Sequence, residues 1–213
     1  MTRFEIILLV MELIGSSAFA ISGVMVAYEN KMDIFGAIVL GCVTAVGGGV
    51  IRDLLLGLNP PSMFTDPSYV FVAFVVSLIT FILKYRKHKI IDDHQEQTVR
   101  MLNITDTIGL AVFAVTGSRT AIAAGYGANP FLCIFVGAVT GIGGGILRDM
   151  MAGQMPLIMR ERVYGVAAVA GSFVYILARA VMPGMWAIII SLTTTMVIRY
   201  LAIHYNWNLP RFH

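Results

Sequence analysis

The chain has 213 residues, of which 58% are hydrophobic and 13% are charged, and its formal net charge is +3. A mean hydropathy of +0.82 excludes a soluble globular domain and indicates an integral membrane protein. The positive charge comes mostly from one loop beside apolar segments, a placement that sets membrane orientation and does not indicate nucleic-acid binding.

Seven apolar segments are long enough to cross a bilayer core of about 30 Å as helices. We expect them near residues 5–27, 34–57, 67–84, 101–123, 130–152, 161–182 and 185–205. The polar stretch 85–100 is expected to be a cytoplasmic loop that divides the chain into two halves. The predicted fold is an all-α integral membrane protein with a single transmembrane domain over residues 1–213.

The first segment has an alternative interpretation as a cleaved signal peptide, because Arg3 precedes an apolar run with a small-residue pattern at 18–20. Glu12 inside the run disfavours cleavage. In addition, IGSSAFAISG at 14–23 returns as IGLAVFAVTG at 108–117. A segment that is repeated later is expected to belong to the mature fold.

Basic residues predict the orientation of the helices. They gather in the stretch 84–100 and at 160–162, whereas the loop between the second and third segments has none. The positive-inside rule therefore predicts that the first, third and fifth loops and the C-terminus lie in the cytoplasm. The N-terminus is expected on the outside.

A second and longer repeat lies in the middle of each half. TAVGGGVIRDLLLG at 44–57 returns as TGIGGGILRDMMAG at 140–153. Because each half contains three segments, an odd number, the second half must cross the membrane in the opposite sense to the first. This predicts two inverted three-helix repeats, at about 5–84 and 101–182, and a seventh helix at about 185–205 without a repeat partner.

Each copy of the long repeat places three consecutive glycines near the middle of a predicted helix. They are Gly47, Gly48, Gly49, Gly143, Gly144 and Gly145. We expect a break in the helix at each triplet. Such a break would free the carbonyls near the first two glycines of each triplet, and these carbonyls could coordinate a monovalent cation. The alternative is that the glycines only allow helices to cross closely.

Charged side chains lie within the predicted spans at matching positions of the two halves. They are Arg52, Asp53, Arg148 and Asp149 in the motif, and Glu12 and Asp106 in the first segment of each half. One hypothesis is that they are ion pairs that avoid the cost of a buried charge. The other is that the arginines form a barrier or gate in a wet cavity whose carboxylates attract cations. The sequence leaves open which carboxylate pairs with which arginine.

No pattern for covalent catalysis is present, so we expect neither enzyme activity nor a cofactor. Neither glycine triplet has the Gly-Lys-Ser/Thr of a P-loop or the spacing of a dinucleotide site. Cys42 and Cys133 lie in apolar runs and are interpreted as buried thiols. The four histidines are too scattered to predict a metal site.

The doubled GGGxxRD motif, in two three-segment repeats with a seventh segment added, resembles the prokaryotic branch of the trimeric intracellular cation (TRIC) channel family. This family has also been called the bacterial glycine transporter domain family. The resemblance covers about residues 5–205. It implies a homotrimer in the bacterial inner membrane, with a potassium-permeable pore through each protomer. Helices two and five, kinked at the glycines, would line that pore.

The resemblance also implies the partners: potassium and sodium ions, membrane lipid and two further copies of the chain. Animal members of the family carry a lysine and a glutamate where this chain reads VIRD at 50–53. The gating, the lipid regulation and the organelle location of those members are therefore not carried over.

Two functions are expected from these features. The first is a monovalent-cation channel, and the alternative is a secondary transporter of glycine or a similar small zwitterion. In the transporter, the start of a half-helix would hold the carboxylate and an acidic side chain the ammonium. A membrane protein without a transport path would leave the charges inside the spans unexplained. For the channel, Arg148→Ala is expected to change conductance or gating with the trimer intact, whereas failed assembly would assign Arg148 a structural role.

Overall fold

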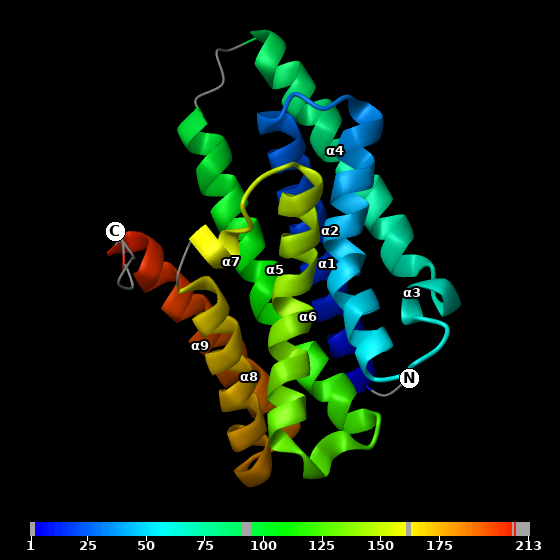
Figure 1. Ribbon diagram of the computed structural model, residues 1–213, viewed down its shortest axis with the longest axis vertical. Helices are drawn as coiled ribbons and strands as arrows, with labels where there is room; N and C mark the ends of the chain where they lie inside the picture. Colours follow the sequence, from blue (N-terminus) through cyan, green and yellow to red (C-terminus); the bar gives the residue numbers. More distant parts are fainter. Residues whose placement is uncertain (1–2, 91–94, 161–162, 206, 208–213) are drawn as a thin grey trace.

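The computed structural model describes residues 3–90, 95–160, 163–205 and 207 (Figure 1). The elements in chain order are α1 (Arg3–Glu29), α2 (Ile34–Leu55), α3 (Ser62–Thr65), α4 (Ser68–Ile90), α5 (Gln95–Ala123), the 3-10 helix η1 (Tyr126–Ala128), α6 (Pro130–Met151), α7 (Leu157–Arg160), α8 (Tyr164–Val181) and α9 (Gly184–His204). Seven of the described helices are long and apolar enough to cross a membrane. The predicted all-α membrane fold is confirmed.

The two halves of the chain run in opposite directions. In Figure 1, α1 rises from the lower end of the bundle, whereas α5, its counterpart in the second half, descends from the upper end. α2 and α6 pack against each other near the centre, also in opposite senses. The connections after α1 and α6 and the C-terminal end of α4 therefore lie toward the upper end, and the connections after α2, α5 and α8 lie toward the lower end. That the upper end faces the cytoplasm stays a prediction.

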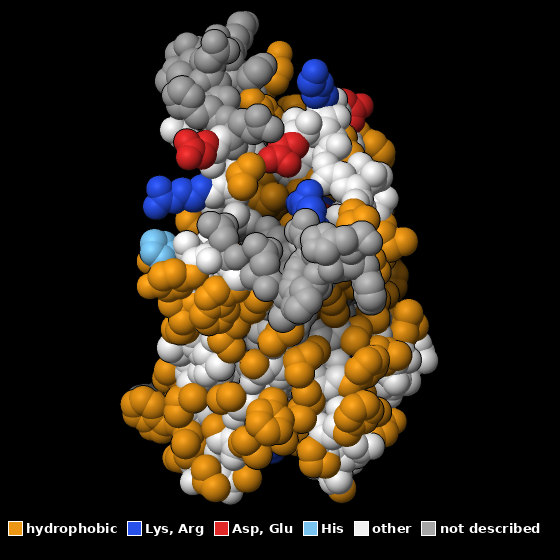
Figure 2. All heavy atoms as spheres, turned by 60° about the vertical axis from the view of Figure 1, so that its left-hand side comes forward, with side chains coloured by type: hydrophobic (Ala, Val, Ile, Leu, Met, Phe, Trp, Pro, Cys, Tyr) orange, Lys and Arg blue, Asp and Glu red, His pale blue; other side chains and the backbone are white. Residues whose placement is uncertain are grey.

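The outer surface has the character of a lipid-exposed protein. On the face shown in Figure 2, hydrophobic side chains cover most of the lower part, and most of the charged side chains gather toward the upper end. Large exposed residues such as Phe131 and Val181 are 79% and 80% exposed in a single protomer. Apolar side chains of this size are stable at a surface that lipid or another protein covers.

The expected polar loop at 85–100 is largely wrong. α4 continues to Ile90 and α5 begins at Gln95, so both helices extend beyond the apolar spans. Lys, Arg, Glu and Gln are good helix formers, and a helix that leaves the membrane can carry them in water. Residues 91–94 and 161–162, which fall in the predicted cytoplasmic loops, lie outside the described residues.

The expected break at the glycine triplets is also wrong. α2 and α6 run without interruption through both triplets. A methyl group added at Gly48 would collide with the carbonyl oxygen of Thr140, and one at Gly144 with the carbonyl oxygen of Thr44. These reciprocal contacts join equivalent positions of the two repeats. The glycines thus let α2 and α6 cross backbone against backbone, as the alternative interpretation holds.

Because the helices are unbroken, their carbonyls accept the regular hydrogen bonds of an α-helix. The structure therefore supplies no freed carbonyl at Gly47, Gly48, Gly143 or Gly144. Cation binding at these oxygens stays an untested prediction and has no part in the function proposed below. Of the two cysteines, Cys133 is buried and Cys42 is half-buried, and both are free thiols.

Candidate functional site

Each repeat builds a polar site from the same four kinds of residue: a carboxylate on its first helix, an Arg-Asp pair in the last turn of its second helix, and a tyrosine at the start of its third. The repeat-one site consists of Glu12, Arg52, Asp53 and Tyr69. The repeat-two site consists of Asp106, Arg148, Asp149 and Tyr164. The sequence prediction missed both tyrosines, although each lies within the first two residues of the third long helix of its repeat.

The motif aspartates anchor short helices that follow them. Arg52 Nε donates to Asp53 Oδ1 at 2.7 Å, and Asp53 Oδ2 accepts from the backbone N–H of Ser62, the first residue of α3, at 2.7 Å. In the second repeat, Asp149 Oδ2 accepts from the backbone N–H of Leu157, the first residue of α7, at 2.8 Å. The N–H groups at the start of a helix lack partners within the helix. The hypothesis of structural pairing therefore describes these two aspartates well.

We expect Asp149→Ala to lower the free energy of unfolding by about 3 kcal/mol, because it breaks a buried ion pair and leaves a buried N–H without an acceptor. A matched control is Asp66→Ala. The carboxylate of Asp66 is exposed and accepts from the backbone N–H of Ser68 at 3.0 Å, so its loss is expected to cost about 1 kcal/mol. Unfolding titrations in mixed micelles measure both, and equal losses would contradict the anchoring role.

The repeat-two site is sealed from solvent. The side chains of Arg148 and Asp106 are both 0% exposed, and Arg148 Nη1 lies 2.6 Å from Asp106 Oδ1. Arg148 Nε donates to Asp149 Oδ1 at 2.8 Å, and its Nη1 also contacts Ser22 Oγ on α1. One arginine on α6 thus joins carboxylates of α5 and α6 to a hydroxyl of α1. This answers the question of pairing that the sequence left open.

A second buried arginine reaches the repeat-two site from α9. Arg199 is 1% exposed, and its guanidinium carbon lies 4.8 Å from the centroid of the Tyr164 ring. Sequence reasoning missed Arg199 because α9 has no repeat partner with which to compare it. The available signal was a lone arginine inside the apolar segment TTTMVIRYLAI at 193–203.

The repeat-one site, in contrast, lines an open cavity of about 360 Å³. Tyr69 donates its hydroxyl to Glu12 at 2.6 Å, and Arg52 is 11% exposed. Hydroxyls of α1, α3 and α5 complete the polar lining, which includes Ser16, Ser62, Thr65 and Thr120. Two carboxylates and one guanidinium give this cavity an excess of one negative charge. Its chemistry suits a small cation or a small zwitterion.

Two stacked rings lie between the sites. Phe19 and Phe113 occupy equivalent positions in the motif that occurs at 14–23 and again at 108–117. Their ring centroids are 5.3 Å apart at an interplanar angle of 18°. Phe113 lines the cavity, whereas Phe19 is 1% exposed and lies one helical turn from Ser22. Along α1, Glu12, Phe19 and Ser22 share one face. The order across the bundle is therefore cavity, aromatic pair, sealed ion pair.

The glycines of each triplet divide into two kinds. The first two face the other central helix: a methyl group at Gly47 would lie 2.6 Å from Leu147, and one at Gly143 would lie 3.0 Å from Ile51. The third faces the polar site of its own repeat. Gly49 lines the cavity, and a methyl group at Gly145 would lie 3.1 Å from the Tyr164 hydroxyl.

These features define a multi-pass membrane protein in which two inverted three-helix repeats enclose a pair of related polar sites. The family model described as "Glycine transporter" matches residues 9–85 and 103–180, one block for each repeat. The chain belongs to this family, and its predicted place in the prokaryotic branch of the TRIC family is confirmed.

Relatives of similar length come from bacteria. The chain is 37% identical to the UPF0126 inner membrane protein YadS of Escherichia coli strain K12, over 95% of this chain and 94% of the relative. It is 35% identical to the UPF0126 membrane protein YvgT of Bacillus subtilis strain 168, over 94% of each chain.

Solved structures of TRIC channels share the fold. One, from a study of conductance through TRIC cation channels, has a TM-score of 0.82 and 38% identity, and the match covers 100% of this chain and 98% of the other. The TRIC trimeric intracellular cation channel orthologue from Rhodobacter sphaeroides has a TM-score of 0.85 and 33% identity, with 94% and 99% covered.

Proposed function

We propose that the chain is a monovalent-cation channel of the bacterial inner membrane, with potassium and sodium as its ions. The route passes through each protomer between α1, α2, α5 and α6, and the protein assembles as a homotrimer in contact with membrane lipid. The observation that carries the proposal is the negatively charged cavity, which the aromatic pair separates from a second polar site of the same design. The solved neighbours described as cation channels support it.

In this proposal the structure is a closed conformation with two barriers in series. The first is the Phe19–Phe113 pair, a narrow apolar contact that excludes hydrated ions. The second is the ion pair of Arg148 with Asp106, whose side chains are fully buried. Opening requires both contacts to separate. We retain as proposals the predicted roles of the Arg-Asp motifs and of the glycines at a pore or gate. The charges lie at the two ends of the proposed route, and the glycines lie where α2 and α6 cross.

The transporter remains a second candidate because of the composition of the cavity. Arg52 and Glu12 line the same space, so one could bind the carboxylate and the other the ammonium of glycine. Access from one side only, within an inverted repeat, is also the resting geometry of an alternating-access carrier. The description of the matched family as a glycine transporter points the same way.

Purified protein in a planar bilayer with a potassium gradient distinguishes the two functions. Unitary currents that reverse near the potassium equilibrium potential support the channel. Saturable glycine uptake into proteoliposomes, without such currents, would overturn it in favour of the carrier.

We expect Glu12→Gln to lower potassium conductance by about threefold or more, because the carboxylate concentrates cations at the mouth of the route. Glutamine retains an oxygen that can accept the hydrogen bond of Tyr69. The matched control is Glu5→Gln, which removes an exposed carboxylate from the same helix. Unitary conductance at low ionic strength is the measurement. An equal change in both variants would argue against Glu12 as the cation attractor.

A further inference from the structure

The two motif aspartates bind short helices that begin with opposite kinds of side chain. Ser62, the first residue of α3, donates its backbone N–H to Asp53 Oδ2 at 2.7 Å. Leu157, the first residue of α7, donates its backbone N–H to Asp149 Oδ2 at 2.8 Å. In Figure 1, α3 and α7 lie on opposite sides of the bundle. Ser62 and Leu157 therefore hold equivalent places in the two repeats, but one is polar and the other is apolar.

The polar residue belongs to the open site. Ser62 is exposed, and its hydroxyl donates to Asp53 Oδ2 at 2.7 Å. The same hydroxyl accepts from Arg52 Nη2 at 3.1 Å. Met63 and Thr65, which follow it on α3, also line the cavity. The short helix of repeat one is therefore a wall of a cavity that solvent reaches.

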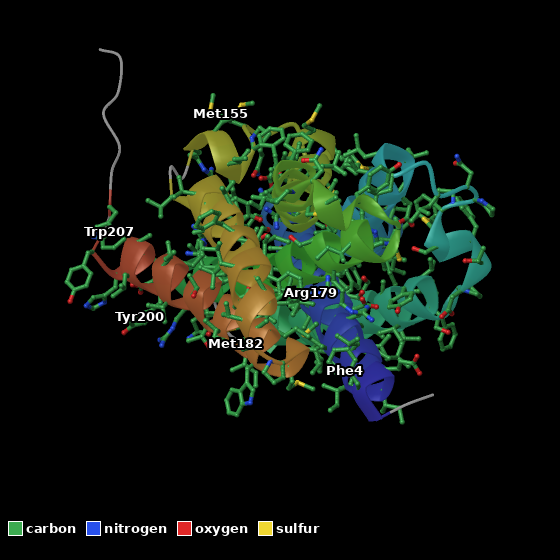
Figure 3. The ribbon with its side chains drawn as sticks, turned by 90° about the horizontal axis from the view of Figure 1, so that it is seen from below. Phe4, Met155, Arg179, Met182, Tyr200 and Trp207 are labelled. Atoms are coloured by element: carbon green, nitrogen blue, oxygen red, sulfur yellow. The ribbon has the colours of Figure 1, made fainter. Side chains whose placement is uncertain are left out.

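The apolar residue belongs to the sealed site. Leu157 is 3% exposed, and Ile158 packs against a buried apolar cluster built from α5, α6 and α8. Met155, in the connection before α7, points away from the bundle in Figure 3, and Met159 is 73% exposed. The side chains of Leu157 and Ile158 thus face inward, next to the aspartate that binds Arg148.

A glycine in a left-handed conformation precedes each short helix. Gly153 has a φ of +68°, and its counterpart before α3, Gly57, has a φ of +70°. Glycine adopts this conformation at no steric cost, and it suits a hinge for the same reason. Beyond the hinge, Gln154 Nε2 donates to Asn30 Oδ1, in the connection after α1, at 3.2 Å. A rotation at Gly153 would break this bond and release α7 from the rest of the bundle.

The sealed site has a reason to take up water when α7 moves. Among the residues that the structure describes, Asp106 Oδ2 and Arg148 Nη2 have no hydrogen-bond partner, although both side chains are 0% exposed. Buried polar groups without partners are costly. Movement of α7 therefore exposes two apolar side chains and hydrates the ion pair. Opposing contributions of this kind are what an element with two positions requires.

We propose that α7 is an apolar lid over the repeat-two site, and that Leu157 is the residue that keeps water and cations out of it. The lid lifts about Gly153 and admits them from the end of the bundle at which α6 ends. Ser62 lacks the bulk and the apolar surface for this role, so the repeat-one site stays open. The inference rests on the proposed channel function only for the identity of the solute that enters.

The test measures access to the repeat-two site and does not require transport. Ser22→Cys, in a Cys42→Ala and Cys133→Ala background, places a thiol beside Arg148. The rate of its modification by 2-aminoethyl methanethiosulfonate, a small cationic reagent, is measured on purified protein. We expect Leu157→Ser to raise this rate by about tenfold, because a polar side chain in this place shifts the lid toward its open position. Leu157→Ala, the milder change, is expected to raise it by about threefold.

The matched control is Met159→Ser. Met159 lies on the same short helix, but its side chain is 73% exposed. The same kind of change there is expected to leave the labelling rate within about twofold of the parent. Labelling of both Leu157 variants at the parent rate would overturn the proposal. An equal rise in Met159→Ser would also overturn it, since burial of Leu157 would then not be what closes the site.

A reciprocal experiment adds a lid to the open site, and it remains decisive if the Leu157 variants do not fold. Ser16 lines the repeat-one cavity, so Ser16→Cys in the same background is expected to label quickly. Ser62→Leu should lower this rate by about tenfold, whereas Ser62→Ala, which removes the hydroxyl without adding bulk, should leave it unchanged. An unchanged rate in Ser62→Leu, or an equal fall in Ser62→Ala, would contradict the role of this position.

Potassium flux is measured separately in proteoliposomes, where Leu157→Ser should exceed the parent. Absence of flux in every variant, with the labelling rates as expected, would contradict the channel function and support the lid. Labelling at the parent rate would contradict the lid whatever the flux. The two proposals can therefore fail independently.

Discussion

Gly144→Ala is expected to prevent the two repeats from packing together. The added methyl group would collide with the carbonyl oxygen of Thr44 on α2, a backbone atom that no side-chain rotation can move away. We therefore expect a loss of more than about 3 kcal/mol of stability. Gel filtration of the solubilised protein should show little or no folded species. Gly48→Ala should behave in the same way because its contact with Thr140 is the reciprocal one.

Gly49→Ala is the control for this prediction. It lies in the same triplet, but the nearest atom to an added methyl group, Arg52 Nη2, is 3.7 Å away. Alanine also favours the helix over glycine by about 1 kcal/mol. The variant should fold at least as well as the wild type. If all three glycine variants fold normally, close crossing of α2 and α6 is not what the triplets provide.

Arg148→Gln is expected to produce the second large effect, a loss of about 3–5 kcal/mol, because it leaves two carboxylates in a dry site after their shared cation is removed. The side chains of Asp106 and Asp149 are 0% and 4% exposed. Thermal unfolding in detergent, followed by the fraction that stays monodisperse, measures the loss. Because of this loss of stability, failed assembly is an alternative to the outcome expected from the sequence, which is altered gating with the trimer intact.

Arg52→Gln provides the comparison within the same protein. Arg52 holds the equivalent position in the first repeat, but it is 11% exposed beside an open cavity. Water can solvate the carboxylates left behind, so the expected loss is about 1 kcal/mol. A difference of this kind between equivalent residues isolates the effect of burial. Similar losses in the two variants would show that the sites are equally dry.

The helices and their duplication were predictable from the sequence because lipid requires long apolar spans and because the two motifs return almost unchanged. The charges of both sites were predictable for a related reason: ionisable residues are rare inside such spans. The tyrosines and Arg199 were not found. The resemblance between the repeats is weak in their third helices, and α9 has nothing with which to be compared.

The conformation at the glycines was beyond sequence reasoning for a different reason. Three consecutive glycines are compatible with a broken helix and with two helices in close contact. What decides between them is the backbone that packs against the triplet, and for Gly144 this is Thr44, far away in the chain. The short helices α3 and α7 were missed similarly, because Asp53 and Asp149, which cap them, belong to the preceding long helices.

The stacked rings of Phe19 and Phe113 have a consequence for the direction of ion flow. Equivalent side chains that touch each other lie on the pseudo-two-fold axis relating the two repeats. The obstacle that they form therefore has the same shape when approached from either face of the membrane. Any rectification of the current through the proposed channel must originate in the two unlike ends, of which one lines an open cavity and the other is sealed from solvent.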